Sequence, residues 1–425
     1  MSMKKYSVVL CSAAAAMAVL SLSACAPTPV QPPAAAPAAT PARAAPPAAA
    51  APPAWQQGRS AAMASSTLAP LAGRNTVTPA NEIPLDKIKL PPGFKAELWA
   101  HGMPGARAMV RGDGGKVYIG TRGIGRVYEV TDTGAARTSR VVVSGLTQPA
   151  GVEFRSGSLY VMAIDKVLRF DGIAANPTAA PVDMTAAFNL PPLQHHNWKY
   201  IRFGPDDKLY VPFGAPCNIC EPTAEYAQIR RYNADGSGME VLARGVRNTV
   251  GFDFHPVTRE LWFTDHGRDW LGEETPHDEL NRMSATGLNF GFPYCHEMGV
   301  ADPDVKKSNP CAGVTLPVAN MGAHSAVMGV TFYTGPMFPA EYRNAMFIMR
   351  KGAWNRTNKI GFDVLVVRAD ADGKNVKSEP FMTGFHDPAS GTFWGRPAYA
   401  LQLPDGSLLV SDEQVGAIYR ISYGR

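Results

Sequence analysis

Short apolar runs alternate with polar turns along most of this chain, and one such pattern recurs six times after residue 110. Each copy has an apolar run, a loop, and a second run in which apolar and polar residues alternate. Runs of this kind, separated by turn residues such as Asp-Gly and Pro-Asp, predict β-strands, and no long amphipathic helix interrupts them. The first runs of the six copies are residues 116–119, 158–161, 208–211, 260–263, 345–348 and 407–410.

The spacing of the copies predicts a propeller. Equivalent residues of the first four copies are 42, 50 and 52 positions apart, which is close to the length of a propeller blade. Six copies therefore predict an all-β domain, a six-bladed β-propeller. The step from Leu261 to Met346 is 85 residues, so an insertion is expected at about residues 284–330, on a functional face.

The N-terminus has the features of a secreted lipoprotein. Two lysines precede an apolar stretch at residues 8–22, which ends in Leu22-Ser23-Ala24-Cys25. This resembles the lipobox of bacterial lipoproteins, so residues 1–24 are expected to be a signal peptide and Cys25 the lipidated residue. The alternative is an ordinary secretory signal. Because Ala26 is not acidic, a lipid anchor in the outer membrane, on the periplasmic side, is expected.

A low-complexity stretch follows the signal. Residues 25–80 are mostly Ala, Pro, Ser and Thr with no acidic residue, and such a composition cannot bury enough apolar surface to fold. We expect a disordered tether there, and a catalytic domain at residues 81–425. The five charged residues before Asn81 are all basic and account for the net charge of +5, leaving 36 basic and 36 acidic residues. A neutral domain does not favour nucleic-acid binding.

Four cysteines remain once Cys11 leaves with the signal and Cys25 takes the lipid. An even number in an oxidising compartment predicts two disulfides, with three possible connectivities. The simplest pairs are local, Cys217–Cys220 and Cys295–Cys311. A four-cysteine zinc site is the alternative, but it would require a second Cys-x-x-Cys motif.

Two adjacent histidines, His195 and His196, precede a strand-like run at residues 200–203 and a tight turn at residues 204–207. Histidine, with an ordinary pKa of about 6.5, suits a general base near neutral pH. The alternative is a pair of surface loop histidines. In a propeller, the tips of different blades converge on one channel, and several polar tips here could meet there. They are residues 245–248, 264–269, 350–352 and 394–397.

Together these segments carry a resemblance that no single one would establish. From Leu90 to Arg425 the chain resembles the glucose/sorbosone dehydrogenase family, six-bladed propellers that use pyrroloquinoline quinone (PQQ) and calcium. The Gly-Ala-Pro-Cys-Asn run at Gly214 is most similar to the sorbosone dehydrogenase branch. The matching motifs are His196 with Gly204-Pro205-Asp206, Arg247-Asn248 with Gly251, Asp265-His266-Gly267, Asp278-Glu279-Leu280-Asn281 and Asn289-Phe290-Gly291-Phe292-Pro293.

The resemblance implies roles for the reacting groups. His196 would take the proton from the anomeric hydroxyl of a sugar, or from an aldehyde hydrate, while hydride passes to the quinone. Arg247 would stabilise developing charge. Asn248 would hydrogen-bond the cofactor. The carbonyls of Gly267 and Arg268 would bind Ca²⁺. Electrons would pass on to an external quinone or cytochrome.

The resemblance also implies contacts to the carboxylates of PQQ, from Gln148, from Arg396, and from either Arg350 or Lys351. Two positions depart from the family pattern. His195 stands where glucose-oxidising members have an acid, and Arg268 stands where proline is usual. These departures count against glucose as the substrate more than against the cofactor.

Three alternatives remain open from the sequence. The acidic residues Asp269, Glu273, Glu274, Asp278 and Glu279 could bind a second metal, or could form a solvated loop in which two of them fix strand ends. The propeller could be a non-catalytic module that binds glycan or protein. It could also be a calcium-dependent sugar lactonase. Lactonase sites use carboxylate and Asn ligands, whereas the tips here are cationic and suit a tricarboxylate cofactor.

Overall fold

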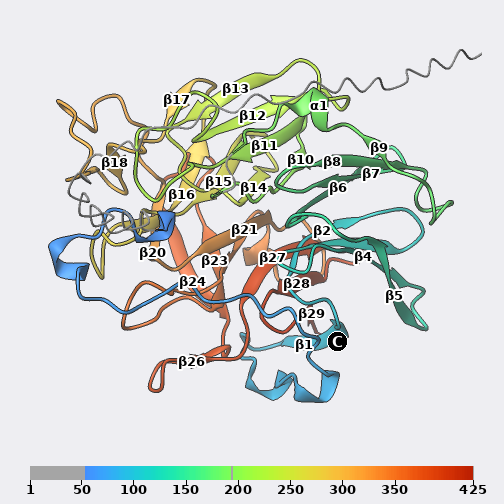
Figure 1. Ribbon diagram of the computed structural model, residues 1–425. Coiled ribbons are helices and arrows are strands. Elements are labelled where there is room, and N and C mark those ends of the chain that lie inside the picture. Colours follow the sequence, from blue (N-terminus) through green and yellow to red (C-terminus); the bar gives the residue numbers. More distant parts are fainter. Residues whose placement is uncertain (1–52, 193–194, 425) are drawn as a thin grey trace, which may run out of the picture. The chain divides into compact units, whose positions relative to one another are not determined.

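Six β-sheets are arranged in a ring around a common centre in the computed structural model, which describes residues 53–192 and 195–424 (Figure 1). Each sheet forms one blade of four antiparallel strands, and the third sheet has a short fifth strand that runs parallel to its neighbour. This confirms the predicted six-bladed β-propeller. The first three blades are β2 (Ala106–Arg111), β3 (Lys116–Thr121), β4 (Val127–Asp132) and β5 (Arg137–Val143); β6 (Gly151–Arg155), β7 (Ser158–Met162), β8 (Val167–Asp171) and β9 (Val182–Asp183); and β10 (Arg202–Phe203), β11 (Leu209–Phe213), β12 (Gln228–Tyr232) and β13 (Glu240–Arg244).

The remaining blades include one that joins the two ends of the domain. The fourth and fifth are β14 (Gly251–Phe254), β15 (Leu261–Asp265), β16 (His277–Met283) and β20 (Ala319–Ala323), and then β21 (Val327–Phe332), β22 (Met346–Arg350), β23 (Asp363–Arg368) and β24 (Lys377–Met382). The sixth has β27 (Pro397–Gln402), β28 (Leu408–Asp412) and β29 (Ala417–Tyr423), with β1 (Phe94–Ala100) as its outer strand. Phe94 lies opposite Tyr423 in this pairing, so the N-terminal strand closes the ring.

Short elements decorate the blades. The only α-helix in the described residues is α1 (Thr185–Phe188), and 3-10 helices occur at Ala54–Gln56, Ala61–Met63, Ala80–Glu82, Leu85–Lys87 and Ala340–Tyr342. Two-residue strands form the pairs β18 (Cys295–His296) with β19 (Val300–Ala301) and β25 (His386–Asp387) with β26 (Thr392–Phe393), while β17 (Leu288–Asn289) joins β13. No helix in the described ranges has the length and apolar character needed to cross a membrane.

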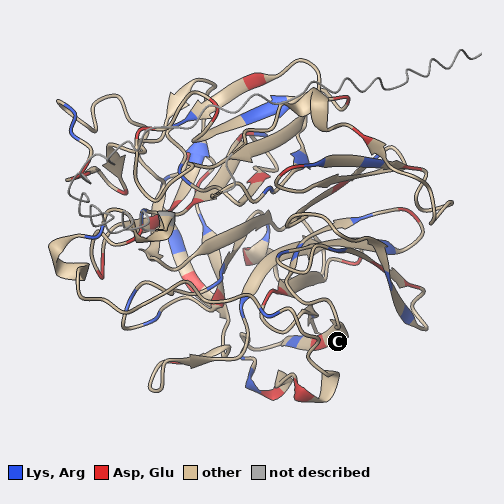
Figure 2. Cartoon of the chain, in the orientation of Figure 1, with Lys and Arg blue, Asp and Glu red and all other residues tan. Residues whose placement is uncertain are grey.

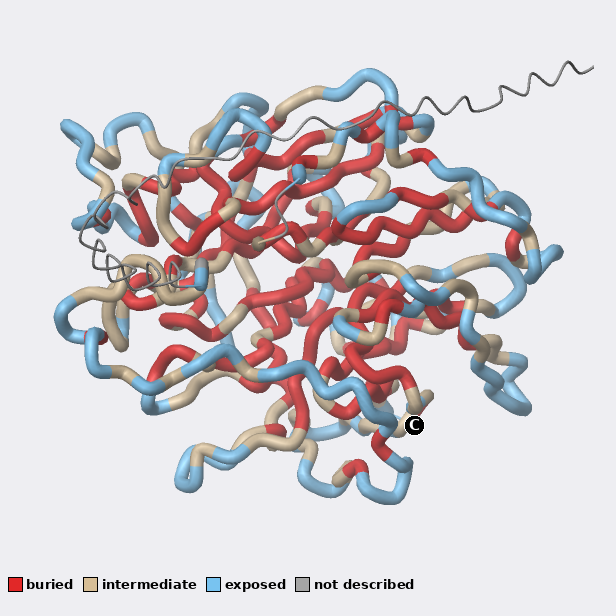
Figure 3. Tube along the Cα trace, viewed as in Figure 1, coloured by how far each residue is buried: buried red, intermediate tan, exposed pale blue. Residues whose placement is uncertain are grey.

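The core lies between neighbouring blades, as the band of buried backbone in Figure 3 shows. Strand β11 is buried along its whole length because both of its faces are covered. One cluster packs Met162 and Val167 of the second blade against Leu209 and Val211 of the third. Each such side chain contributes about 1.5–3 kcal/mol when it is fully buried. The continuous apolar runs of the sequence are therefore the inner strands of the blades.

The insertion is shorter than predicted. Of residues 284–330, β17 extends the third blade and β20 is the outer strand of the fourth, so only the intervening stretch stands outside the sheets. Ala319–Ala323 gives a weak strand signal because its sequence, ANMGA, has little apolar alternation. Both predicted disulfides are present, Cys217–Cys220 and, in the insertion, Cys295–Cys311.

The structure differs from the prediction for the second half of the tether. Residues 53–80 belong to the same compact unit as the propeller, so the folded domain includes residues that were predicted to be a tether. Apolar residues scattered among the Ala and Pro, such as the buried Met63, supply anchors that the average composition concealed. The predicted signal peptide, Cys25 and the first half of the tether lie outside the described residues. Lysines, arginines and acids are interspersed over the rest of the chain (Figure 2).

Candidate functional site

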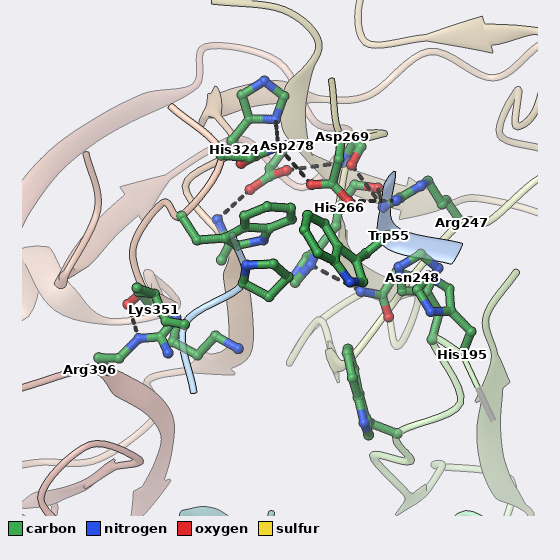
Figure 4. A pocket seen from close by; sticks show the side chains of 18 of the residues that line it. Trp55, His195, Arg247, Asn248, His266, Asp269, Asp278, His324, Lys351 and Arg396 are labelled. Atoms are coloured by element: carbon green, nitrogen blue, oxygen red, sulfur yellow. Dashed lines mark hydrogen bonds and ion pairs between the residues drawn. The ribbon is translucent and has the colours of Figure 1, made fainter. Parts of the chain in front are cut away.

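Loops from several blades line a cavity of about 120 Å³ (Figure 4). Its walls fall into two halves. One half carries three histidines together with Arg247 and Asn248, and the other carries a group of cations. Among the side chains that line the cavity are Trp55, Leu71, Arg122, His195, His196, Trp198, Arg247, Asn248, His266, Asp269, Asp278, His324, Lys351, Trp354, Asn355 and Arg396.

His196 is the buried residue of the predicted histidine pair. Its backbone has φ +51°, and a Cβ at Gly214 would lie 2.1 Å from its carbonyl oxygen, so glycine is required opposite it. Its Nδ1 is buried without a hydrogen-bond partner. Burial, followed by the nearby Arg247, holds its pKa well below the ordinary range. The imidazole is therefore neutral and its ring nitrogen is available to a ligand.

Two further histidines that line the cavity, His195 and His266, are also neutral. Burial and Arg247 lower the pKa of His195 to about 4. Burial and Lys351 lower the pKa of His266 to about 3. The rings of His195 and His196 have centroids 4.0 Å apart, which places two uncharged imidazoles side by side. The predicted base thus lies in the cavity with a histidine neighbour.

A buried aspartate positions Arg247 and Asn248. Asp265, the last residue of β15, accepts hydrogen bonds from the backbone N–H of Arg247 (2.7 Å) and of Asn248 (2.6 Å). Burial raises its pKa to about 7. Because both amides converge on one carboxyl group, the two neighbouring side chains are fixed in direction. The motifs Arg247-Asn248 and Asp265-His266 are therefore one structural unit.

Arg247 is almost fully buried and held on all sides. It donates to the carbonyl and side-chain oxygens of Asn218 (3.0 and 2.7 Å), to the Gly267 carbonyl (2.8 Å) and to Asp269 (3.2 Å). Asn218 itself lies inside the Cys217–Cys220 disulfide loop. This network fixes the guanidinium before any ligand arrives.

Asn248 presents an unused acceptor to the cavity. Its Nδ2 contacts His266 Nδ1 at 3.1 Å, and the opposite ring nitrogen of His266 makes a short contact with the Val327 carbonyl. This arrangement requires His266 to donate to Val327 and to accept from Asn248. The Oδ1 of Asn248 is buried and has no partner, so it can accept a hydrogen bond from a ligand.

The other half of the cavity gathers four cations around one carboxylate. The distances to the Glu413 oxygens are 2.5 Å from Arg107, 3.5 Å from Arg122, 3.8 Å from Arg396 and 3.9 Å from Lys351. The cations hold the pKa of Glu413 well below its ordinary range, and burial lowers the pKa of Lys351 well below 10.5. One carboxylate cannot neutralise three arginines, so this half keeps an excess of positive charge even without a charge on Lys351.

The cavity lining brings together most of the predicted site residues: His196, Arg247, Asn248, Gly267, Lys351 and Arg396. It leaves three out. Arg350 pairs with Asp363 at 2.5 Å. Of the two candidates for the cofactor contact, Arg350 and Lys351, it is therefore Lys351 that lines the cavity. Gln148 lines an adjoining cavity with Arg122 and Glu413. The side chain of Arg268 turns away to Asp302 and Asp304.

The excess of cations fits an anionic ligand. Uncompensated buried charge is costly, and a ligand with several carboxylates would neutralise Arg122, Lys351 and Arg396. The free acceptor of Asn248 and the free ring nitrogen of His196 add polar contacts at the other half. The donor set therefore fits a polycarboxylate such as PQQ.

The protein supplies little for a calcium ion. The Gly267 carbonyl already accepts from Arg247, and Ca²⁺ takes six to eight oxygen ligands. Within the described residues, no three His, Cys, Asp or Glu side chains are placed to hold a metal. Most ligands of a bound Ca²⁺ would have to come from water or from a second ligand.

The predicted acidic cluster is dispersed. Asp278 accepts from backbone N–H groups of Gly267, Ala326 and Val327, and Glu279 accepts from that of Glu297. Asp269 accepts from Arg247 and Asn355. Glu273 accepts from the Thr357 amide, and Glu274 accepts from Arg356. These contacts favour the alternative in which Asp278 and Glu279 fix strand ends.

Several lining residues were not predicted from the sequence. Trp55 lay in the assumed tether, and Arg122, Trp198, His324 and Trp354 carry no motif. Of the residues without a predicted role, only His266 lies in a recognised motif, Asp265-His266-Gly267, in which a role was predicted for Gly267 alone.

Comparisons with known proteins agree with this architecture. The profile of the TrAA12-like family matches residues 88–388. The chain belongs to the TrAA12-like family. An uncharacterised protein of Borreliella burgdorferi is 30% identical over 364 residues, which are 82% of this chain and 94% of that protein.

Solved structures share the fold of this TrAA12-like chain. The calcium structure of a family AA12 enzyme of Trichoderma reesei has a TM-score of 0.67 at 16% identity, covering 79% of this chain and 97% of that one. The holo PQQ domain of pyranose dehydrogenase from Coprinopsis cinerea gives 0.64 at 17%, with 79% and 97% covered. The apo soluble aldose sugar dehydrogenase of Escherichia coli gives 0.58 at 18%, with 78% and 99% covered.

Proposed function

We propose that this protein is an oxidoreductase that oxidises an aldose or a sugar aldehyde, with PQQ as its cofactor. The observation that carries the proposal is the divided cavity, in which neutral histidines face a buried excess of cations. Proteins of the same fold named pyranose dehydrogenase PQQ domain and aldose sugar dehydrogenase support it. The family match supports it as well.

The cationic half binds the cofactor. Lys351, Arg396 and Arg122 would contact its carboxylates as cations, with Gln148 close by in the adjoining cavity. Arg107 remains paired with Glu413 at 2.5 Å and keeps the group in place. When bound, PQQ supplies a quinone that accepts a hydride.

The histidine half binds the sugar and moves the proton. His196, neutral and with a free Nδ1, takes the proton of the reacting hydroxyl at a ring nitrogen. Arg247, fixed by Asn218 and Asp269, stabilises the negative charge that develops on that oxygen. Asn248 accepts a hydrogen bond at Oδ1 and orients the bound molecule.

The proposal also covers the substrate, the metal ion and the electron acceptor. His195 in place of an acid favours an aldehyde hydrate, as in the sorbosone dehydrogenase branch, over glucose. Ca²⁺ is also required, with most of its ligands supplied by water or by the cofactor, because the chain offers few. Electrons pass to an external quinone or cytochrome.

Reconstitution tests the proposal directly. Purified protein with PQQ and Ca²⁺ should show a changed cofactor absorbance spectrum and should reduce an artificial dye when given an aldose or aldehyde. Omission of PQQ should abolish dye reduction. Protein that leaves the PQQ spectrum unchanged at saturating concentration would instead be a glycan- or protein-binding propeller. Hydrolysis of a sugar lactone without PQQ would indicate a lactonase.

We also propose that Cys25 carries a lipid that anchors the domain to the outer membrane, on the periplasmic side. The basis is the apolar segment that ends in Leu22-Ser23-Ala24-Cys25. Cys25→Ser should move the protein from the membrane fraction to the soluble fraction. The substituted protein fractionating with membranes as before would contradict the anchor.

A further inference from the structure

Residues 53–75, here called the strap, supply part of the lining of the cavity. In Figure 1 the blue N-terminal segment runs along the blades from near β20 towards β1. Trp55 and Leu71 line the main cavity, and Gly73 and Asn75 line the adjoining cavity beside Arg122. The strap therefore spans both halves of the site. It lies outside residues 88–388, so the family match does not include it.

The strap is docked through specific main-chain contacts. Trp270 Nε1 donates to the Trp55 carbonyl (2.5 Å), and the Ser60 N–H donates to the Trp270 carbonyl (3.0 Å). Arg268, completely buried, makes a short contact with the Gly58 carbonyl. A Cβ at Gly58 would lie 2.3 Å from Arg268, so only glycine permits this close approach. Such contacts hold one definite position.

Docking of the strap is linked to the arginine of the site through Asn218. The Asn218 Nδ2 donates to the Gln57 carbonyl (2.7 Å), while its Oδ1 accepts from Arg247 (2.7 Å). One side chain thus holds the strap and the guanidinium together. The strap is a part of the site rather than a neighbour of it.

Aromatic rings form the wall that the strap completes. The centroid of Trp55 lies 6.0 Å from that of Trp354 and 6.3 Å from that of Trp270. Trp55 and Trp354 are both half-buried, which leaves indole surface facing the cavity. The apolar face of a sugar ring can pack against such surface. Figure 4 shows Trp55 among the side chains of the histidine half.

We propose that the strap limits the substrate to a single sugar unit, with Trp55 as the residue that sets the limit. This inference rests on the proposed sugar oxidation. A monosaccharide bound beside His196 would lie under Trp55, whereas the second unit of an oligosaccharide would have to pass through the strap at Trp55 or Leu71. Removal of the Trp55 side chain opens that path and also removes contact surface for the first unit.

The test compares a monosaccharide with the trisaccharide that carries the same reducing-end sugar. Wild-type holoenzyme should prefer the monosaccharide in kcat/KM, and Trp55→Ala should reduce that preference by at least about tenfold. Trp55→Phe should keep most of it. Val77→Ala is the control, because Val77 follows the strap directly in the chain, is 56% exposed and lines neither cavity.

A second measurement follows docking without activity. Arg59 packs over Trp270 at 4.1 Å, so trypsin should cleave after Arg59 slowly in the wild type and faster in Trp55→Ala. An unchanged preference in a variant that trypsin cleaves faster would overturn the size limit. Rapid cleavage of the wild type would overturn docking itself. Slow cleavage without oxidation or binding of any sugar would refute the proposed function, and the size limit with it.

Discussion

The two halves of the cavity are both buried, yet one is neutral and the other is charged. In the histidine half, burial lowers the pKa of His195 to about 4 and that of His266 to about 3, and these groups give up their charge. In the cationic half the arginines stay charged, because the pKa of a guanidinium is too high to be lowered into the working range. The side-chain types chosen for each half therefore decide its charge.

This difference assigns separate tasks to the two halves. A neutral imidazole can accept a proton, whereas a permanent cation can only hold an anion. Arg247 is the cation placed beside His196 in the histidine half, and Asp269 contacts it at 3.2 Å. Variants that change one half should leave the task of the other in place.

The largest expected effect comes from the base. His196→Ala should lower kcat by roughly 10²–10⁴-fold while PQQ binding, measured by its absorbance, persists. His195→Ala should lower kcat less, because the buried ring with the free Nδ1 is that of His196. Normal turnover by the His196 variant together with an inactive His195 variant would show that the base is His195 and not His196.

The next effect concerns the carboxylate that holds the cationic half. Glu413→Gln leaves the buried Arg107 and Arg396 without a counter-charge and should lower the free energy of unfolding by about 3 kcal/mol. Urea denaturation measures it, and added PQQ should recover part of the loss. The control is Glu379→Gln, whose exposed pair with Arg368 is worth less than about 1 kcal/mol. Equal losses in both variants would mean that the cations are not in excess.

The histidine half should make the free energy of unfolding depend on pH in the acidic range. His195 has a folded-state pKa of about 4, below the ordinary value near 6.5, so the unfolded chain binds its proton first. Its contribution to stability is complete above pH 6.5 and is lost as the pH falls towards 4. His195→Gln should flatten the dependence of unfolding free energy on pH in that window, by up to about 1.4 kcal/mol per pH unit. An unchanged slope would contradict the lowered pKa.

The smallest expected effect is the uptake of part of a proton when PQQ binds. Burial holds the pKa of Lys351 well below 10.5, and a bound polycarboxylate should raise it. PQQ binding should therefore take up a fraction of a proton, which calorimetry in two buffers of different ionisation enthalpy detects. Lys351→Met should abolish the uptake. Proton release by the wild type would mean that the ligand carboxylates do not reach this lysine.

The fold was predictable because each inner strand is covered on both faces and so appears as an apolar run in the sequence. The motif residues His196, Arg247 and Asn248 could be placed because they flank such runs. Glu413 could not be identified in the same way, since its partner Arg107 lies 306 residues away and a lone glutamate carries no motif. Long-range pairing of this kind is decided by closure of the ring.

The choice between Arg350 and Lys351 as the cofactor contact could have been predicted from the pairing of two strands. Arg350 is the last residue of β22 and lies directly opposite Asp363 of β23, which makes it a cross-strand ion pair. Pairing the two strands by their alternation would have left Lys351 for the cavity. Trp55 offered no comparable signal, because the composition around it resembles that of an unfolded linker.

The pairing of β1 with β29 has a consequence for biosynthesis. The sixth sheet needs a strand near the start of the chain and three from its end, so the ring cannot close until residue 423 has been made. During synthesis, β1 emerges first and has no partner until the last codons are translated. A nascent chain cut short by even one strand leaves Phe94 and its neighbours on an open edge, where aggregation and proteolysis begin. Closure thus discriminates full-length protein from incomplete copies.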